Sequence, residues 1–113
     1  MLLRAGIIGF GKMGRIRAAA LENSGRAVIA KVCDLDPLQD VNYAVAQTVE
    51  EIVEDPNIDL VHICLPNYLN FPTTIAALRA NKHVFCEKPP AFSAAEVRQV
   101  AQAERSFGRV LMY

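Results

Sequence analysis

The sequence has no excess of charge of either sign, no long apolar run and few cysteines. Its 113 residues carry 12 basic and 12 acidic side chains, so the formal net charge is zero. A balanced charge gives no indication of nucleic-acid binding or of attachment to a membrane surface. No apolar run approaches the roughly 20 residues that a transmembrane helix needs. We therefore expect one soluble globular domain whose partners include neither nucleic acid nor a membrane.

The beginning of the chain also lacks the pattern of a secretory signal. No basic region precedes the first apolar residues, and MLLRAGIIGFG leads directly into a glycine turn. Cys33, Cys64 and Cys86 are odd in number and have no metal-ligand spacing, so we expect no metal site. All three lie in apolar runs, where a buried, reduced and inert thiol is expected. Since disulfides are rare in the cytosol, these thiols favour a cytoplasmic location.

What the sequence does contain is an alternation of short apolar runs and helical stretches. Apolar runs rich in Val and Ile predict strands at residues 2–8, 27–34, 43–46 (the weakest), 60–65, 83–86 and 109–113. Helices are predicted at residues 12–23, from Thr48, at 71–80 and at 93–107. Met13, Ile16 and Ala20 form the apolar stripe of the first helix. This order predicts an α/β fold of the Rossmann type, a doubly wound parallel sheet with helices on both faces, as one domain over residues 1–113.

Unusual residues follow the predicted strands. Ligands of such sheets bind outside the carboxyl ends of the strands, where the strand order reverses. The carboxyl ends here carry GFG at residues 9–11, Asp34, the pair Pro66-Asn67, and EKP at residues 87–89. Their common place at one edge of the sheet is a stronger indication of a binding site than any single motif.

The segment GFGKMG has the spacing of a dinucleotide-binding turn. Gly9, Gly11 and Gly14 would provide a tight turn, close approach of the backbone to a pyrophosphate, and close packing of helix on strand. The following helix offers free N–H groups and a partial positive charge to the phosphates. The alternative is a purely structural turn. We expect all six residues to contact the cofactor: Gly9, Phe10, Gly11, Lys12, Met13 and Gly14.

Asp34 ends the second predicted strand, 20 residues after Gly14. An acid at this place can bind the ribose hydroxyls of the adenosine half. Leu35 follows, so no adjacent Arg is available for a 2′-phosphate, and the sequence favours NAD over NADP. A structural role for Asp34 in the turn DLDP is the alternative.

The end of the fourth predicted strand would form the wall of the same crevice. We expect Leu65, Pro66 and Asn67 to contact the cofactor, although Asn67 could equally cap a turn. His62 is interpreted as a core histidine and His83 as an anchor for its strand, because neither has the partner pattern of a catalytic base.

The segment HVFCEKPP ends an apolar strand with Glu87 and Lys88, and two prolines stiffen the chain after them. A solvated turn is the simplest interpretation. At the ligand edge, however, Lys88 could donate a hydrogen bond to a substrate oxygen and stabilise developing alkoxide charge. Glu87 is expected to contact the cofactor and to orient Lys88.

Four segments together resemble the N-terminal half of the glucose–fructose oxidoreductase, inositol 2-dehydrogenase and rhizopine catabolism family: AGIIGFGKMG, VCDLDP, IDLVHICLPN and NKHVFCEKP. The resemblance implies an NAD(P)-dependent oxidoreductase that transfers hydride between nicotinamide C4 and a carbinol carbon of a sugar or cyclitol. It implies that Lys88 lies near the nicotinamide and the substrate, before a cis proline at Pro89. The family continues into a second domain that supplies the substrate pocket and the oligomer interface, and we expect this chain to lack it.

Three departures from the family pattern stand out. Asn70 replaces the usual His, Asn81 replaces the usual Gly, and the connection from Asp34 to Tyr43 is too short for a full crossover helix. Bilin reductases of the same superfamily share the short connection. Without a substrate domain, the alternative function is a non-catalytic nucleotide-sensing module.

Overall fold

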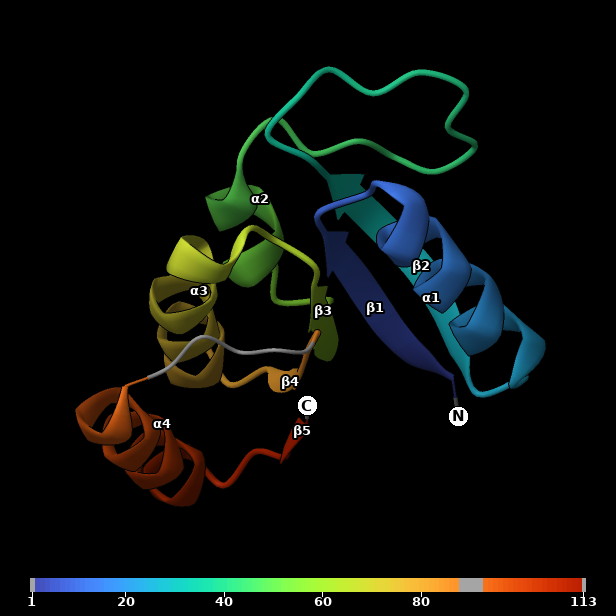
Figure 1. Cartoon of the computed structure of the whole chain (residues 1–113). Helices are drawn as coiled ribbons and strands as arrows, with labels where there is room; N and C mark the ends of the chain where they lie inside the picture. The colour runs from blue at the N-terminus through green and yellow to red at the C-terminus, as the bar shows by residue number, and fades with distance from the viewer. Residues whose placement is uncertain (1, 88–92, 113) are drawn as a thin grey trace.

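The computed structural model describes residues 2–87 and 93–112. A five-stranded parallel sheet forms the centre of the domain, as the alternating pattern predicts (Figure 1). Its strands are β1 (Leu3–Ile8), β2 (Ala27–Cys33), β3 (Leu60–Ile63), β4 (His83–Cys86) and β5 (Leu111–Met112). The helices are α1 (Lys12–Asn23), α2 (Val49–Val53), α3 (Asn67–Arg79) and α4 (Ala94–Phe107).

The strands run in the order β2-β1-β3-β4-β5, so the order reverses between β1 and β3. Their ends are level: Ile8 pairs with Cys33 on one side and with Ile63 on the other, and Ile63 pairs with Cys86. The residues directly after these four strands therefore form one row, which we call the carboxyl edge: Gly9, Asp34, Cys64 and Glu87. Backbone hydrogen bonds of 2.7–2.9 Å continue the ladder into this row, from the N–H groups of Gly9, Cys64 and Glu87.

The two faces of the sheet are covered unequally. Figure 1 shows α1 on one side of the strands and α2, α3 and α4 on the other. The larger core lies on the side of the three helices, where Ile8, Val61 and Ile63 pack against Ile52 and Leu78. In the described part of the chain, no helix combines the length and the apolar character of a membrane-spanning segment.

Helix α1 packs on the sheet through its smallest residues. Gly14 and Ala18, one turn apart, are buried, while Met13 and Ile16 are 40% and 47% exposed. The predicted apolar stripe was therefore wrong. Close contact with the strands is made where a side chain is absent or is a single methyl group, and Leu21 is the larger apolar side chain of α1 that packs against the core containing Ala18.

Several predicted elements also differ from the structure. Strand β3 ends at Ile63, two residues before the predicted end, and β5 begins at Leu111, two residues after the predicted start. Residues 43–46 form no strand, and only a single bridge between Val45 and Val32 extends the sheet beyond β2. The short connection before it contains no helix, as expected. Helix α3 begins four residues before the predicted start, directly after Pro66, and accommodates Pro72 in its interior.

Residues whose chemistry suits helix termini lie at several helix ends. Asn81 has the left-handed conformation (φ 64°) expected of a helix C-terminal residue, and Gly108 does the same after α4. Ser93 and Glu96 form a complete capping box. At α2, Thr48 Oγ1 accepts a hydrogen bond from the Glu51 N–H, but the Glu51 carboxylate accepts from the Gln47 N–H and not from the Thr48 N–H, so this capping box is incomplete.

Candidate functional site

The three glycines of the first turn meet three different surroundings. Gly9 has a φ of 94°, and a Cβ there would lie 2.4 Å from the carbonyl oxygen of Cys64. A Cβ on Gly14 would lie 2.1 Å from the carbonyl oxygen of Gly9. A Cβ on Gly11 would meet nothing within 4 Å, and the φ of −82° at Gly11 is open to any residue. The fold therefore requires glycine at positions 9 and 14. It does not require glycine at position 11, where the space beside the backbone is open.

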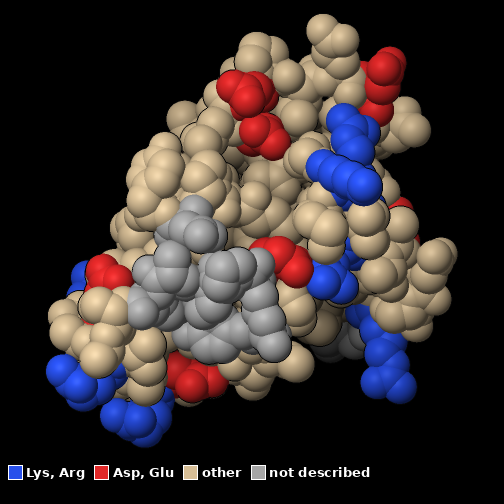
Figure 2. Space-filling view, in the orientation of Figure 1, with Lys and Arg blue, Asp and Glu red and all other residues tan. Residues whose placement is uncertain are grey.

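This open space lies at the N-terminus of α1. Gly11 is the N-cap and makes no side-chain cap, so the first N–H groups of the helix have no partner within the helix. Such a terminus attracts anions, and Figure 2 shows Lys and Arg side chains gathered along the side of the molecule formed by α1. The residues present fit the pyrophosphate of a dinucleotide.

Phe10 and Asp34 connect the glycine turn to the end of β2. The Phe10 N–H donates to Asp34 Oδ2 at 2.7 Å, and the Asp36 N–H donates to Asp34 Oδ1 at 3.2 Å. Asp34 therefore does act in the DLDP turn, and each of its oxygens retains capacity to accept a further hydrogen bond. The Phe10 side chain is buried against Tyr43, so this residue can offer only its backbone to a cofactor. A groove of about 460 Å³ begins at Asp34 and extends to residues 45–47.

The crevice wall is formed where β3 leads into α3. Leu65 is half-buried and Pro66 is exposed, directly before the first turn of α3. Asn67 is the first residue of that helix, so its backbone lies at the switch point between β1 and β3. Asn70, at the position of the family His, is buried, and among the described residues its Oδ1 has no hydrogen-bond partner.

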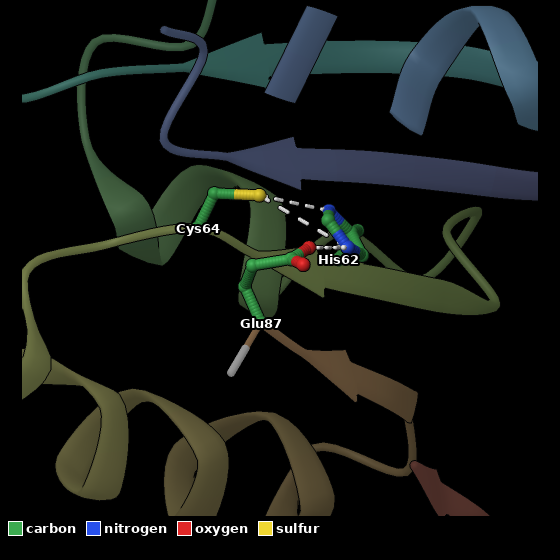
Figure 3. Close-up of side chains that lie close together, drawn as sticks. All are labelled: His62, Cys64 and Glu87. Atoms are coloured by element: carbon green, nitrogen blue, oxygen red, sulfur yellow. Dashed lines mark hydrogen bonds and ion pairs between the residues drawn. The ribbon is translucent and has the colours of Figure 1, made fainter. Parts of the chain in front are cut away.

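A hydrogen-bonded cluster occupies the carboxyl edge at β3 and β4 (Figure 3). His62 Nε2 lies 3.2 Å from Glu87 Oε2, and His62 Nδ1 lies 3.1 Å from Cys64 Sγ. Arg17 of α1 completes the cluster with two hydrogen bonds to Glu87: Nε donates to Oε2 at 3.1 Å, and Nη2 donates to Oε1 at 2.9 Å. The structure therefore gives the Glu87 carboxylate protein partners on both oxygens.

Burial sets the protonation states in this cluster. It lowers the pKa of His62 to about 4, so the ring is neutral at pH 7, and it raises the pKa of Cys64 to about 12. Hydrogen bonding to Arg17 lowers the pKa of Glu87. A neutral ring that donates Nε2–H to the carboxylate must accept at Nδ1, so Cys64 S–H is the donor there. Cys64 is thus a protonated thiol, although it is less buried than the sequence led us to expect.

His62, Cys64 and Glu87 each offer one atom of a kind that binds metals, and these atoms lie within 4.8 Å of one another. A cation there would need the Cys64 thiolate and an oxygen of Glu87. The thiol is protonated, and both oxygens are bonded to Arg17. This donor set is therefore used in hydrogen bonds and suits a metal poorly.

Lys88, the predicted catalytic residue, lies outside the described residues, as do Pro89 and Pro90. Its neighbour Glu87 is placed on the carboxyl edge, one peptide bond away. His83 anchors its strand as predicted: its Nδ1 accepts a hydrogen bond of 3.0 Å from the N–H of Val110, the residue directly before β5.

Sequence reasoning missed Arg17 and the polar partners of His62. The pairing of Arg17 with Glu87 spans 70 residues and has no local signal. His62 could have been found from the two-residue period of strands: Val61 and Ile63 are in the larger core, so His62 and Cys64 share the opposite face. His62 is paired with Phe85, and Glu87, two residues further along the chain and directly after β4, lies on the same face.

Together, the strand order and the glycine turn define a dinucleotide-binding Rossmann domain. A sequence model of the oxidoreductase family with an NAD-binding Rossmann fold matches residues 3–113. The chain belongs to this family, which confirms the resemblance stated from its motifs.

Individual relatives agree with this assignment. The chain is 30% identical to a myo-inositol 2-dehydrogenase of Thermotoga maritima and 36% identical to an inositol 2-dehydrogenase of Salmonella typhimurium. Each match covers 96% of this chain but only 35% of the relative. A biliverdin reductase of Synechocystis, solved with biliverdin and NADP+, superposes with a TM-score of 0.87 at 28% identity, over 97% of this chain and 37% of that one. The chain thus spans about a third of the length of these proteins.

Proposed function

We propose that this chain is the cofactor-binding part of an oxidoreductase that transfers hydride, reversibly, between a nicotinamide dinucleotide and a carbinol carbon of a sugar or cyclitol. The observation that carries the proposal is the level row of strand ends. Gly9, Asp34, Cys64 and Glu87 lie side by side at the place where open α/β sheets bind ligands. The names of the inositol dehydrogenases support the choice of substrate class.

Residues at this edge and beside it would each bind a different part of the cofactor. The N–H groups at the start of α1 would hold the pyrophosphate over Gly11, where a side chain is absent. Asp34 would accept hydrogen bonds from the adenosine ribose, with the groove beside it for the adenosine. Leu65, Pro66 and Asn67 would form the opposite wall. An acid followed by Leu35 favours NAD, because it offers no positive charge to a 2′-phosphate.

The chemistry would take place at the other end of the crevice. The dinucleotide supplies the hydride acceptor in oxidation and the donor in reduction. Lys88 follows the carboxyl edge at β4, and its ammonium group would donate a hydrogen bond to the substrate oxygen. That bond strengthens as negative charge develops on the oxygen, which is how a positioned cation lowers the barrier.

The test is an assay of the full-length protein with NAD+ and a set of cyclitols and sugars, followed at the absorbance of NADH. We expect turnover of at least one polyol with NAD+, and loss of turnover in Lys88→Ala with little change in NAD affinity. NAD binding without turnover of any polyol would contradict the proposal and favour a nucleotide-sensing module.

A further inference from the structure

Two side chains from two different elements converge on Glu87, the residue directly before Lys88. Arg17 of α1 binds both oxygens of Glu87, and His62 of β3 shares one of them. The Glu87 N–H also donates to the carbonyl oxygen of Ile63 at 2.9 Å. Glu87 is thus fixed in its backbone by β3 and in its side chain by α1 and β3.

The hydrogen bonds to Glu87 restrict the orientation of its carboxylate. Arg17 presents a planar fork to a carboxylate, which restricts both the distance and the orientation of the pair. The neutral ring of His62 is buried against Phe85, with 4.8 Å between ring centroids, and the Cys64 thiol bonds its other nitrogen. The ring can therefore donate only through Nε2, toward the carboxylate.

These hydrogen bonds connect the helix that follows the glycine turn to the residue directly before Lys88. Helix α1 begins at the glycine turn, and its second turn carries Arg17. Glu87 precedes Lys88 in the chain. We propose that Arg17 and His62 are positioning residues, which act through Glu87: they fix this residue, directly before Lys88 in the sequence, relative to the helix that holds the cofactor.

This inference rests on the proposed role of Lys88. A purely structural ion pair would predict a loss of stability alone. The chain offers a matched control for that case, because Lys31 forms a salt bridge of 3.0 Å with Asp55 that involves no residue of the carboxyl edge. Arg17 and Lys31 have similar side-chain exposure, 38% and 35%.

The experiment compares Arg17→Met, Arg17→Lys and Lys31→Met in the full-length enzyme. Methionine retains most of the apolar stem and removes the charged group. We expect Arg17→Met to lower kcat by at least about tenfold, since displacement of a catalytic group by ~1 Å is enough for such a loss. The dissociation constant of NAD should change by less than about threefold. Arg17→Lys should recover part of kcat, and Lys31→Met should leave it unchanged.

Two further readouts separate positioning from stability. Loss of Arg17 removes the main cause of the low pKa of Glu87, so this carboxylate protonates at higher pH. Among the described residues, the charged or titratable groups that interact with it are Arg17, His62, Cys64 and Cys86. The acid limb of kcat should then move to higher pH in Arg17→Met and stay in place in Lys31→Met. Crystal structures with bound NAD should show Lys88 Nζ displaced in the first variant alone.

The possible failures are distinguishable. Absence of polyol turnover in the unmodified enzyme would refute the proposed function itself, and full turnover in Lys88→Ala would refute the role of Lys88 on which this inference rests. An inactive Lys88→Ala together with wild-type kcat and an unmoved acid limb in Arg17→Met would overturn only the positioning role. If Arg17→Met unfolds, His62→Gln provides the second variant, because its amide N–H can still reach Glu87, and it should retain more activity than His62→Leu. Equal activity of the two His62 variants would contradict the inference.

Discussion

Substitutions of Gly11 and Gly14 should separate cofactor binding from folding, although the two residues lie three positions apart in one motif. A Cβ at Gly14 would lie 2.1 Å from a backbone oxygen, which cannot move without moving the glycine turn or α1. Overpacking of this kind costs about 3 kcal/mol. For a domain of this size, that corresponds to a fall in Tm of about 10 °C in Gly14→Ala.

Gly11→Val should behave in the opposite way. Its Cβ meets no atom within 4 Å and its backbone angles are ordinary, so the loss of stability should stay near ~1 kcal/mol, the cost of a poor N-cap. The side chain would, however, fill the space over the start of α1. Loss of two charge-assisted hydrogen bonds to the pyrophosphate, at about 2 kcal/mol each, lowers NAD affinity several-hundredfold.

The assay has two parts. Thermal unfolding followed by circular dichroism gives the stability of each variant, and calorimetric titration with NAD+ gives the affinity. Because the chain contains no Trp, calorimetry is better suited than intrinsic fluorescence. The reasoning would be refuted by a Gly11→Val variant that binds NAD+ within about threefold of the wild-type affinity, or by a Gly14→Ala variant with unchanged Tm.

Three other predictions concern His62, Asp34 and Lys88. His62 is neutral in the fold, with a pKa of about 4 against 6.5 in the unfolded chain, so its contribution to stability is complete above pH 6.5 and is lost as the pH falls toward 4. That loss is about 3 kcal/mol, and urea unfolding at pH 7.5 and 4.5 should show a much smaller difference for His62→Gln. Asp34→Ala should weaken NAD binding by tenfold or so and NADP binding less, as titration with each nucleotide would measure; the reverse order would overturn the preference for NAD. Lys88→Ala should lower kcat by about a hundredfold or more while NAD affinity stays within about threefold, and unchanged turnover in steady-state assays would exclude a catalytic role.

Much of the fold could be predicted because its signals are local. Helix 12–23 ends where the sequence indicated, and Asn81, Ser93 and Gly108 act at helix ends as their chemistry suggests. The common edge of the strand ends also follows from local signals, because parallel strands of similar length bring their carboxyl ends together.

The errors concern contacts that no local pattern encodes. The segment 43–46 has the composition of a strand, yet its neighbours in the turn-rich connection leave only the bridge at Val45. The buried side of α1 was misjudged because a helix that approaches a sheet closely buries Gly14 and Ala18. The pairing of Arg17 with Glu87 joins residues 70 positions apart, and only the packing of α1 across the sheet brings them together.

The most direct test of the central claim is the transfer of deuterium. The full-length protein would be incubated with NAD+ and a polyol substrate deuterated at its carbinol carbon, and the reduced cofactor would be analysed by mass spectrometry and NMR. We predict that one deuterium appears at nicotinamide C4, on one face of the ring, and that Lys88→Ala suppresses its appearance. Tight binding of NAD+ with no deuterium transferred from any sugar or cyclitol would contradict the account.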